Sequence, residues 1–508
     1  MTRQFIFGET RADPQPIGTL MSLQAERSPN RPALTFEGRT FSRAELDRGA
    51  NRRARMLAAL GVGVDDLVAI ALPNGIEFHE TAFAVWKLGA TPAPLSHRLP
   101  DSELQAILGV MAPRLVVGMT ADRAPGHLVV PAGTQPDQAL DDSPLEPRAA
   151  LYQKAITSGG STGTPKVIVD HTPASLDPSV IGLGMTLDDT IIVPGPLYHN
   201  SPFGLSHRAL CRGAHVIEVA KFDPEQTLAL IEQYRIGWAL MVPTMMRRIW
   251  ALPPDVRDRY DLSSLQMVVH MAAPCPVWLK RAWIDWLGPD RVWEVYAGTE
   301  RMGAVHIGGR DWLAHPGSVG KPAAGRVSIV DPDGNPCPPG EVGEIRFHPA
   351  PDAAGPSYHY LGAASKAGAG SDGYGDMGHF DADGFLFIDD RRTDMIVSGG
   401  ANIYPAEVEG VLEQHPEILA SAVVGLPDDD LGQRLHAIAE ARDPAAPPAL
   451  DDLARHLADG LARYKLPYTL EFVTGPLKDD AGKVRRSQLR LDRIARVEAG
   501  ERFDRLRS

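Results

Sequence analysis

One segment of the chain has the residue types that bind a polyphosphate. Residues 156–166 read Ile-Thr-Ser-Gly-Gly-Ser-Thr-Gly-Thr-Pro-Lys. The glycines allow a tight turn that points backbone N–H groups at an anion, and the lysine adds positive charge. Further donors come from four hydroxyl side chains: Thr157, Ser158, Ser161 and Thr162. The segment is not a Walker loop, because Pro165 and Val167 replace the residues that flank the lysine of that motif. The other interpretation is a flexible linker.

This loop resembles the Thr-Ser-Gly-(Ser/Thr)-Thr-Gly-x-Pro-Lys signature of the adenylate-forming superfamily. That group includes acyl-CoA synthetases, the adenylation domains of peptide synthetases and luciferases. The match runs from Ser158 to Lys166, and further segments match in the family's order along nearly the whole chain. The resemblance implies a catalytic role for Lys166 and a nucleotide held by Thr157, Ser158, Gly159, Gly160, Ser161, Thr162 and Gly163.

The segment Tyr-Ala-Gly-Thr-Glu at residues 296–300 resembles the family's Tyr-Gly-x-Thr-Glu motif. The resemblance implies that Tyr296 stacks on adenine beside Ala297, that Thr299 touches the α-phosphate, and that Glu300 binds Mg²⁺. A metal is the sensible partner, because a carboxylate is repelled by a triphosphate unless a cation bridges them. On its own, a Thr-Glu pair would be an ordinary solvated turn.

Two further segments resemble the family's Thr-Gly-Asp and Gly-Arg pair, namely residues 375–376 and 389–391. By that resemblance Asp376 holds the ribose hydroxyls, and Arg391 contacts ribose or phosphate. A carboxylate that accepts hydrogen bonds from two neighbouring hydroxyls is sound chemistry. The alternatives are a turn cap for Asp376 and a competing role for Arg392.

Two C-terminal segments complete the match. Residues 395–409 resemble the segment that follows the family's hinge, which implies a hinge near Thr393 and places Gly399 and Gly400 beside the pantetheine arm of CoA. Residues 476–483 resemble the C-terminal Gly-Lys motif, which makes Lys483 the adenylation lysine. Its charge would stabilise the attack of one anion on another. The alternative for the segment with Gly399 and Gly400 is a simple hairpin turn, and the alternative for the Gly-Lys motif is a surface turn.

Two weaker matches concern the acyl group. Residues 196–202 resemble a segment whose histidine borders the acyl pocket, so that His199 either gates the pocket or fills it. Residues 271–274 resemble a Gly-Ala-Ala-Pro turn beside adenine, which implies nucleotide contacts for Ala272 and Ala273 or, alternatively, an ordinary buried turn. The expected pocket residues are His199, Phe203, Met271, Ala272 and Met302. Their mostly small or apolar character predicts a bulky, apolar acid.

The resemblance implies an acid–thiol ligase. A carboxylate attacks the α-phosphate of MgATP, and CoA then displaces AMP from the acyl-AMP, so ATP, Mg²⁺ and CoA are expected. The C-terminal domain is expected to rotate between the two steps. The expected catalytic residues are Lys483, Lys166, Glu300 and His199. CoA is favoured over an in-chain carrier, because only residues 484–508 follow Lys483. An enzyme that loads a separate carrier protein is an alternative.

Several residues depart from the family pattern. They are Gly159 in the phosphate loop, Val167 directly after its lysine, Met271 in the pocket turn and Thr393 at the hinge. In addition, Arg301 directly follows Glu300, where it either points outward or pairs with Glu300 and competes with Mg²⁺. The second arrangement supports another alternative, a ligase that is weak in adenylation and mainly thioesterifies a preformed acyl-AMP.

The elements around the motifs alternate between helix and strand in the first third of the chain. Ser42 and Glu45 form a capping box that begins a helix ending at Gly61. Strands are predicted at residues 67–72, 93–95 and 115–117, with a helix over 78–88. This alternation predicts a mostly parallel sheet covered by helices, which binds phosphates beyond the carboxyl ends of its strands.

The later part of the chain changes character. Residues 316–389 contain short β runs between Gly, Pro and Asp turns, which predicts an antiparallel β subdomain. A helix from Pro405, a strand over 421–426 and an amphipathic helix over 450–464 predict a small α+β domain. We therefore expect an α/β protein. A large N-terminal domain (1–392) combines βα sheets with the antiparallel subdomain, and a small mobile C-terminal domain covers 393–508.

Composition limits the remaining choices. A chain of 508 residues exceeds the roughly 250–300 that one core supports, so at least two domains are expected. The net charge of −13 argues against a duplex nucleic-acid binder. We find no apolar run of the roughly 18–20 residues that a bilayer requires, no signal peptide and no zinc-type cysteine spacing. We expect a cytoplasmic enzyme whose partners are a carboxylic acid, ATP or AMP, and CoA; a homodimer is compatible with the sequence.

Overall fold

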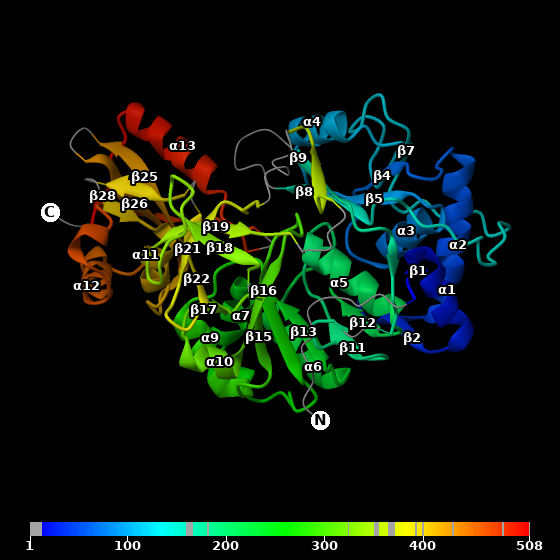
Figure 1. Ribbon diagram of the computed structural model, residues 1–508, viewed down its shortest axis with the longest axis horizontal. Coiled ribbons are helices and arrows are strands. Elements are labelled where there is room, and N and C mark those ends of the chain that lie inside the picture. The colour runs from blue at the N-terminus through cyan, green and yellow to red at the C-terminus, as the bar shows by residue number, and fades with distance from the viewer. Residues whose placement is uncertain are drawn as a thin grey trace. The chain divides into compact units, whose positions relative to one another are not determined.

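The computed structural model describes residues 13–158, 166–179, 182–323, 325–349, 355–363, 371–391, 394–398, 401–428, 431–479 and 482–506. For Ser158, Asp390, Arg391 and Asn402 it describes the backbone alone. The chain forms two compact units (Figure 1). The first contains Met1–His270, Asp290–Ala304 and Ala350–Gly370, and the second contains Met271–Pro289, Val305–Pro349 and Ser371–Ser508. No helix within the described ranges is long and apolar enough to cross a membrane.

The first unit contains a mostly parallel sheet in which β15, β14, β13, β11, β12, β2 and β3 follow one another. The strands are β2 (Pro32–Phe36), β3 (Arg39–Ser42), β11 (Thr190–Ile192), β12 (His215–Glu218), β13 (Trp238–Met241), β14 (Met267–Met271) and β15 (Val292–Ala297). The helices between them are α5 (Asn200–Cys211), α6 (Pro224–Gln233), α7 (Pro243–Trp250) and α8 (Pro254–Arg257). Strand β11 pairs in parallel with β12 and β13, and β13 pairs in parallel with β14. All four residues of β13 are buried, as expected for a strand with both faces covered.

A second βα sheet has the order β5-β4-β6-β7, and all its pairings are parallel. Its elements are α1 (Ile17–Arg27), α2 (Arg43–Ala59), β4 (Leu67–Ile70), α3 (Ile76–Lys87), β5 (Thr91–Pro94), α4 (Asp101–Met111), β6 (Leu115–Val117) and β7 (Val129–Val130). Helix α2 begins with the predicted capping box, because Ser42 Oγ accepts the Glu45 N–H and the Glu45 carboxylate accepts the Ser42 N–H. The predicted parallel βα arrangement is therefore confirmed.

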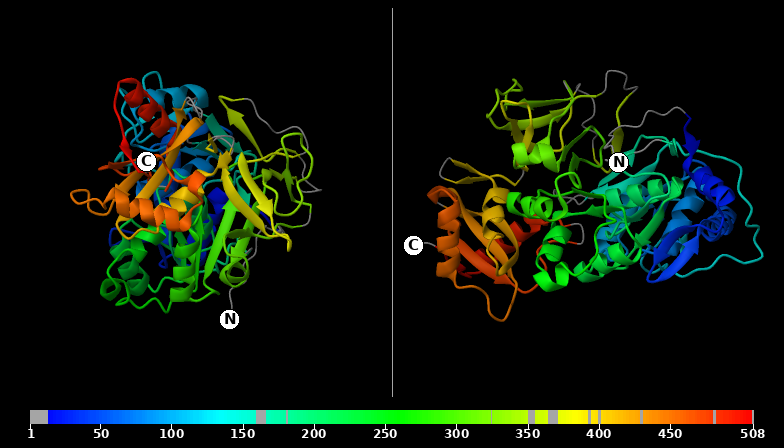
Figure 2. Two further views of the ribbon diagram at one scale, coloured as in Figure 1. Left: turned by 90° about the vertical axis from the view of Figure 1, so that its left-hand side faces the viewer. Right: turned by 90° about the horizontal axis from the view of Figure 1, so that it is seen from below.

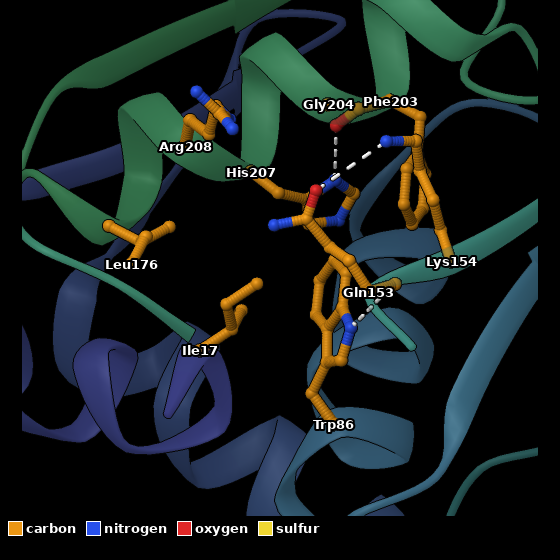
Figure 3. A pocket seen from close by; sticks show the side chains of 9 residues that line it. All are labelled: Ile17, Trp86, Gln153, Lys154, Leu176, Phe203, Gly204, His207 and Arg208. Carbon is orange, nitrogen blue, oxygen red and sulfur yellow. Dashed lines mark hydrogen bonds between the residues drawn. The ribbon is translucent and has the colours of Figure 1, made fainter. Parts of the chain in front are cut away.

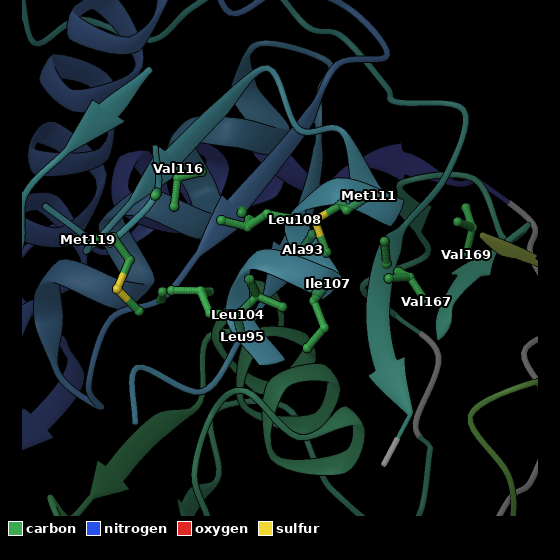
Figure 4. Packing of buried hydrophobic residues seen from close by; sticks show 14 residues of the cluster. Ala93, Leu95, Leu104, Ile107, Leu108, Met111, Val116, Met119, Val167 and Val169 are labelled. Atoms are coloured by element: carbon green, nitrogen blue, oxygen red, sulfur yellow. The ribbon is translucent and has the colours of Figure 1, made fainter. Parts of the chain in front are cut away.

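A three-stranded antiparallel sheet carries the predicted phosphate loop. Its order is β20-β9-β8, with β8 (Lys154–Ser158), β9 (Lys166–Asp170) and β20 (Tyr358–Leu361). Ala155, Val167 and Val169 from this sheet are buried in one apolar cluster with Ile107 and Met111 of α4, as Figure 4 shows for the β9 and α4 residues. This packing fixes both strands that flank the loop. A short pair, β1 (Gln15–Pro16) with β10 (Ser175–Leu176), lies in the same unit.

The second unit contains the predicted antiparallel β subdomain, in the order β17-β22-β21-β19-β18. Its strands are β17 (Ser318–Gly320), β18 (Val327–Val330), β19 (Gly343–Phe347), β21 (Asp376–Phe380) and β22 (Leu386–Arg391). Each pairing that joins neighbours in this sheet is antiparallel. Helices α9 (Val277–Leu287) and α10 (Gly309–Ala314) and strand β16 (Ala304–Gly308) precede it in the chain.

The C-terminal part is an α+β layer built on the sheet β25-β26-β27-β28. Its elements are β23 (Ile396–Ser398), β24 (Ala401–Ile403), α11 (Pro405–Leu412), β25 (Ile418–Asp428), β26 (Gly432–Ala441), α12 (Leu450–Gly460), the 3₁₀ turn η1 (Arg463–Lys465), β27 (Thr469–Val473), α13 (Arg486–Glu498) and β28 (Asp504–Arg505). Val423 of β25 packs with α11 and α12, whereas Val424 faces α13, so the helices cover opposite faces of the sheet (Figures 1 and 2).

One predicted boundary in this part is wrong. The helix expected over residues 450–464 ends at Gly460, and Tyr464 lies in the 3₁₀ turn with an exposed side chain. Leu461 has an extended backbone (φ −132°, ψ 145°), which stops the helix, and glycine at the last position weakens it. Sequence periodicity continued through the turn because Leu461 still reaches the apolar core.

Candidate active site

The β8–β9 hairpin presents the two ends of the predicted phosphate loop. Thr157 is half-buried near the end of β8, and Lys166 is the first residue of β9, paired with Ser158. The loop residues Gly159, Gly160, Ser161, Thr162 and Gly163 lie outside the described part of the chain. Because the two strand ends are direct cross-strand partners, the loop leaves and returns at neighbouring points, which suits a turn that wraps around an anion.

Lys166 and Glu300 belong to one polar cluster centred on Tyr360. The Lys166 Nζ atom lies 4.5 Å from the centroid of the Tyr360 ring. The Tyr360 hydroxyl donates a hydrogen bond to Glu300 Oε1 at 2.9 Å, and Ser357 Oγ donates to the Glu300 carbonyl oxygen at 2.7 Å. The structure thus brings together a lysine and a carboxylate that the sequence places in separate motifs. One oxygen of Glu300 faces the phenol, which leaves the second oxygen as the candidate metal ligand.

The segment that carries Glu300 follows β15. Tyr296 is half-buried and Ala297 is exposed at the end of that strand, while Thr299, Glu300 and Met302 are half-buried in the turn beyond it. Strands β11, β13 and β14 of this sheet run parallel, and ligands of such sheets bind beyond the carboxyl ends of the strands. The position of this turn therefore fits the role that the sequence predicts for it.

Arg301 is an exposed residue whose guanidinium contacts Asp170. Its backbone is left-handed (φ +56°), and its Nη1 atom lies 3.5 Å from Asp170 Oδ2 on β9. Lys154 Nζ donates to the same carboxylate oxygen at 2.8 Å. Burial alone would raise the pKa of Asp170, but the charges of Lys154 and Arg301 outweigh it and hold that pKa well below its usual range. The guanidinium is thereby directed to Asp170 and away from a pairing with Glu300.

His199 and Phe203 lie at the start of α5. His199 is the half-buried residue before the helix, and its ring centroid is 4.5 Å from that of Tyr198. Phe203 is buried one turn later, with ring centroids 4.5 Å from His207 and 5.4 Å from Trp86. Figure 3 shows these three side chains around a small cavity. Phe203 therefore packs in an aromatic cluster. The acyl-pocket roles of His199 and Phe203 stay predictions.

The predicted pocket turn follows β14. Met271 and Ala273 are half-buried, and Ala272 is exposed with φ +77°. A left-handed conformation is unfavourable for alanine, and such strained residues concentrate at functional sites. The local geometry is therefore unusual at the position where the sequence predicts contact with the nucleotide and the acyl group.

Asp376 and Arg391 lie directly opposite each other in the second unit. Asp376 begins β21 with a buried side chain and pairs with Arg391 at the end of β22. The preceding Gly375 has φ +83°, a conformation that favours glycine. Nearby on the same strands, His379 Nδ1 lies 2.9 Å from Asp389 Oδ2. Burial raises the pKa of Asp389, and the contact with His379 opposes that shift. The predicted ribose-binding pair thus shares one antiparallel ladder.

Lys483 is exposed at the end of a tight turn. The Asp479 N–H donates to the Lys483 carbonyl oxygen at 2.9 Å, Asp479 Oδ1 accepts the Lys483 N–H at 2.9 Å, and Gly482 has φ +75°. Lys478, just before the turn, donates to Glu413 at 2.7 Å and anchors the turn to the helix side of the unit. The lysine is thus carried by a well-anchored turn. Thr393, Gly399 and Gly400 lie outside the described residues.

A second group of possible metal ligands consists of His315, Asp381 and Asp383, whose ligand atoms lie within 4.8 Å of one another. His315 Nδ1 is 2.8 Å from Asp381 Oδ2, and the His315 ring stacks on Phe385. Asp381 Oδ1 also accepts the backbone N–H groups of Asp383 and Phe385. These contacts form an ordered β-turn, which accounts for the proximity of the three side chains without a metal ion.

Sequence reasoning missed three residues of the first unit that contact the predicted site: Asp170, Ser357 and Tyr360. Asp170 is the last residue of β9 in the phosphate-loop hairpin, whereas Ser357 and Tyr360 lie beside and on β20, which pairs with that hairpin only in the folded chain. The available signal was weak. The run Tyr358-His359-Tyr360 has strand-like residues, but its partner strand cannot be read from local patterns.

Known proteins similar to this chain cover nearly all of it. The AMP-binding enzyme family model matches residues 21–350, and the AMP-binding enzyme C-terminal domain model matches residues 407–483. A feruloyl-CoA synthase from an Amycolatopsis species is 33% identical over 497 residues, which cover 94% of this chain and 99% of the relative. The fatty acid–[acyl-carrier-protein] ligase ScoC of Streptomyces coeruleorubidus is 30% identical, with 92% of this chain and 95% of the relative covered.

Solved structures agree with these matches. The o-succinylbenzoate CoA synthetase (MenE) of Bacillus subtilis, in complex with its acyl-adenylate intermediate OSB-AMP, superposes with a TM-score of 0.80 and 26% identity. The alignment covers 94% of this chain and 98% of the synthetase. The same synthetase is also known in complex with ATP and a magnesium ion.

Proposed function

The chain belongs to the adenylate-forming family of AMP-binding enzymes, and on this premise we propose that it joins a bulky, apolar carboxylic acid to CoA. It is an ATP-dependent acyl-CoA ligase that works through an acyl-adenylate. The observation that carries the proposal is the cluster of Lys166, Tyr360 and Glu300, because it joins the phosphate loop to the Thr-Glu turn.

The reaction needs no protein nucleophile. The substrate carboxylate attacks the α-phosphorus of ATP, an acyl–phosphate bond forms, and pyrophosphate leaves. The CoA thiol then loses its proton to solvent and attacks the acyl carbonyl carbon, the bond between that carbon and the bridging oxygen breaks, and AMP leaves with the bridging oxygen. Both steps depend on positioning and on charge placed where negative charge develops.

Six of the predicted site residues have roles in binding MgATP. Lys166 binds a phosphate oxygen, Thr299 contacts the α-phosphate, and Tyr296 stacks on adenine. Glu300 would hold Mg²⁺, whose positive charge neutralises the phosphates. Asp376 and Arg391 bind the ribose, a role that their cross-strand pairing supports.

The second step uses the C-terminal part of the chain. We assign the C-terminal domain to residues 393–508, with the hinge near Thr393. Lys483 acts in adenylation, and Gly399 and Gly400 approach the pantetheine arm of CoA after the domain has rotated. The exposure of Lys483 on an anchored turn supports this assignment, because the ammonium can enter and leave a site without unfolding its own support.

The acid is proposed to carry a bulky apolar group, such as an aromatic ring. The residues assigned to its pocket are His199, Phe203, Met271, Ala272 and Met302. The named relatives support an aromatic acid, because feruloyl and o-succinylbenzoyl groups both contain an aromatic ring. The test is a panel of ferulate, o-succinylbenzoate, a long-chain fatty acid and acetate, each with ATP, Mg²⁺ and CoA. We expect aromatic acyl-CoA esters; a preference for acetate would contradict the proposal.

Loading of a carrier protein is a second candidate, because ScoC is by name an acyl-carrier-protein ligase. Thioester formation on a phosphopantetheinyl carrier, without thioester formation on free CoA, would select it. The idea of an enzyme weak in adenylation loses its main support, since Arg301 contacts Asp170. Equal competence in pyrophosphate release and in thioesterification of synthetic acyl-AMP is expected, and slow pyrophosphate release alone would revive that idea.

A further inference from the structure

We propose that Tyr360 is a positioning residue for adenylation, which orients Glu300 toward the metal and holds Lys166 beside it. The inference rests on the proposed function and assigns a task to a residue that no motif includes. Tyr360 does not need to touch the substrate for this task. It acts through two distinct parts of its side chain, the hydroxyl and the ring face.

The hydroxyl acts on Glu300. It donates to Oε1 at 2.9 Å, while Ser357 Oγ holds the carbonyl oxygen of the same residue at 2.7 Å. The carboxylate is therefore fixed through its side chain and its backbone at once. A ligand carboxylate with one oxygen engaged by a neighbour presents the other in a defined direction, and such partners commonly change metal affinity about 10–100-fold.

The ring acts on Lys166. A lysine ammonium 4.5 Å from a ring centroid is attracted by the negative face of the ring. The flexible lysine side chain is thereby kept over the ring whose hydroxyl contacts Glu300 before the nucleotide arrives. A phosphate oxygen is a stronger partner than a ring, so the ammonium can transfer to ATP when ATP binds. The ring thus reduces the conformational freedom that the lysine loses on binding.

The backbone holds Tyr360 itself in place. It lies in β20, opposite Ile168 of β9, and its ring centroid is 4.9 Å from that of the buried Tyr358. Since Lys166 begins β9, the strand pairing that sets the position of Tyr360 also sets the position of the lysine. The Asp170–Arg301 contact, at the other end of β9, ties the residue after Glu300 to the same strand. Lys166, Tyr360 and the turn that carries Glu300 are therefore all held by the small sheet of β8, β9 and β20.

Two substitutions separate the two parts of the side chain. Tyr360→Phe keeps the ring and removes the hydroxyl, whereas Tyr360→Leu removes both. Tyr234→Phe is the matched control, because Tyr234 is also half-buried but packs against His215 on another sheet. Calorimetric titration with ATP, in EDTA and over a Mg²⁺ series, measures the metal-dependent and metal-independent parts of nucleotide affinity.

For Tyr360→Phe we expect about a tenfold higher Mg²⁺ requirement and unchanged ATP affinity in EDTA. Tyr360→Leu should weaken ATP binding in EDTA as well. In the half-reactions, Tyr360→Phe should slow pyrophosphate release and leave thioesterification of synthetic acyl-AMP unchanged, whereas a general structural defect would slow both. Melting temperatures monitor folding of each variant.

A Mg²⁺ titration of Tyr360→Phe that matches that of Tyr234→Phe overturns the inference, as does an equal loss in both half-reactions. The proposed function fails by a different result, namely a wild-type chain that binds MgATP but forms no acyl thioester. In that case the calorimetric comparison of the variants still decides the role of Tyr360.

Discussion

The buried ion pair of Lys154 and Asp170 allows a quantitative stability prediction. Asp170 Oδ2 accepts Lys154 Nζ at 2.8 Å, and Oδ1 accepts the Thr172 N–H at 2.9 Å. The two charged side chains are only 5% and 2% exposed. Asp170→Asn keeps the size of the side chain but removes its charge, so the buried ammonium of Lys154 loses its counterion.

The expected cost follows from this burial. Removing one partner of a buried ion pair costs about 3–5 kcal/mol. Burial lowers the pKa of Lys154, so proton loss from the stranded lysine relieves part of the cost and favours the lower end of that range. The second partner, Arg301, is 37% exposed, and Arg301→Ala should cost less than about 1 kcal/mol. We therefore expect a loss of about 3 kcal/mol for Asp170→Asn, localised at the β8–β9 hairpin.

Amide hydrogen exchange measures this local stability directly. A loss of about 3 kcal/mol should speed exchange of the amides of residues 154–158 and 166–170 roughly 100-fold, at about 1.4 kcal/mol for each factor of ten. The matched control is Asp141→Asn, which breaks the exposed pair with Arg55 and should leave the exchange rates unchanged. If Asp170→Asn behaves like Asp141→Asn, the buried pair does not stabilise the hairpin and the reasoning is refuted.

Three further predictions concern Lys483, the half-buried His215 and a helix cap. Lys483→Ala should slow pyrophosphate release about 100-fold or more and spare thioester formation from synthetic acyl-AMP; equal losses would contradict its role. Burial lowers the pKa of His215 from 6.5 to about 4, so its contribution to stability is full above pH 6.5 and decreases as the pH falls toward 4. His215→Gln should therefore flatten the urea-stability profile in that window, and an unchanged slope would argue against this assignment. Ser42→Ala removes the acceptor of the Glu45 N–H and should lower the free energy of urea unfolding by about 1 kcal/mol, and no measurable loss would exclude a stabilising cap.

Much of the fold was predictable because its signals are local. The capping box at Ser42 begins α2, and Pro405 is the first residue of α11, where its missing N–H costs nothing. Strand β18 (Val327–Val330) lies within the segment of residues 316–389 that was expected to contain short β runs, and the sheet around it is antiparallel as expected. The predicted end of the helix over residues 450–464 was wrong, because the apolar spacing continues past Gly460, where the backbone leaves the helical conformation.

The candidate site was predictable only in part. Motif spacing identified Lys166 and Glu300 separately, because each motif is a short run of residue types. The partner of Arg301 was not predictable, because the two arrangements considered for it were an outward-pointing side chain and a pairing with its sequence neighbour Glu300. Asp170 is its partner in the structure because β9 carries that carboxylate toward the turn after β15.

The sequence by itself predicted the chemistry of this protein through a candidate phosphate loop, a candidate metal carboxylate at Glu300, Lys483 near the C-terminus, and the order in which they occur. Only the tertiary structure decided that Lys166 and Glu300 both contact Tyr360, because the register between β20 and β9 places Tyr360 opposite Ile168. A shift of one residue in that register would turn the phenol to the other face of the sheet. Residue types and their spacing can be read directly from the chain, whereas contacts between distant strands depend on which strands pair and in which register.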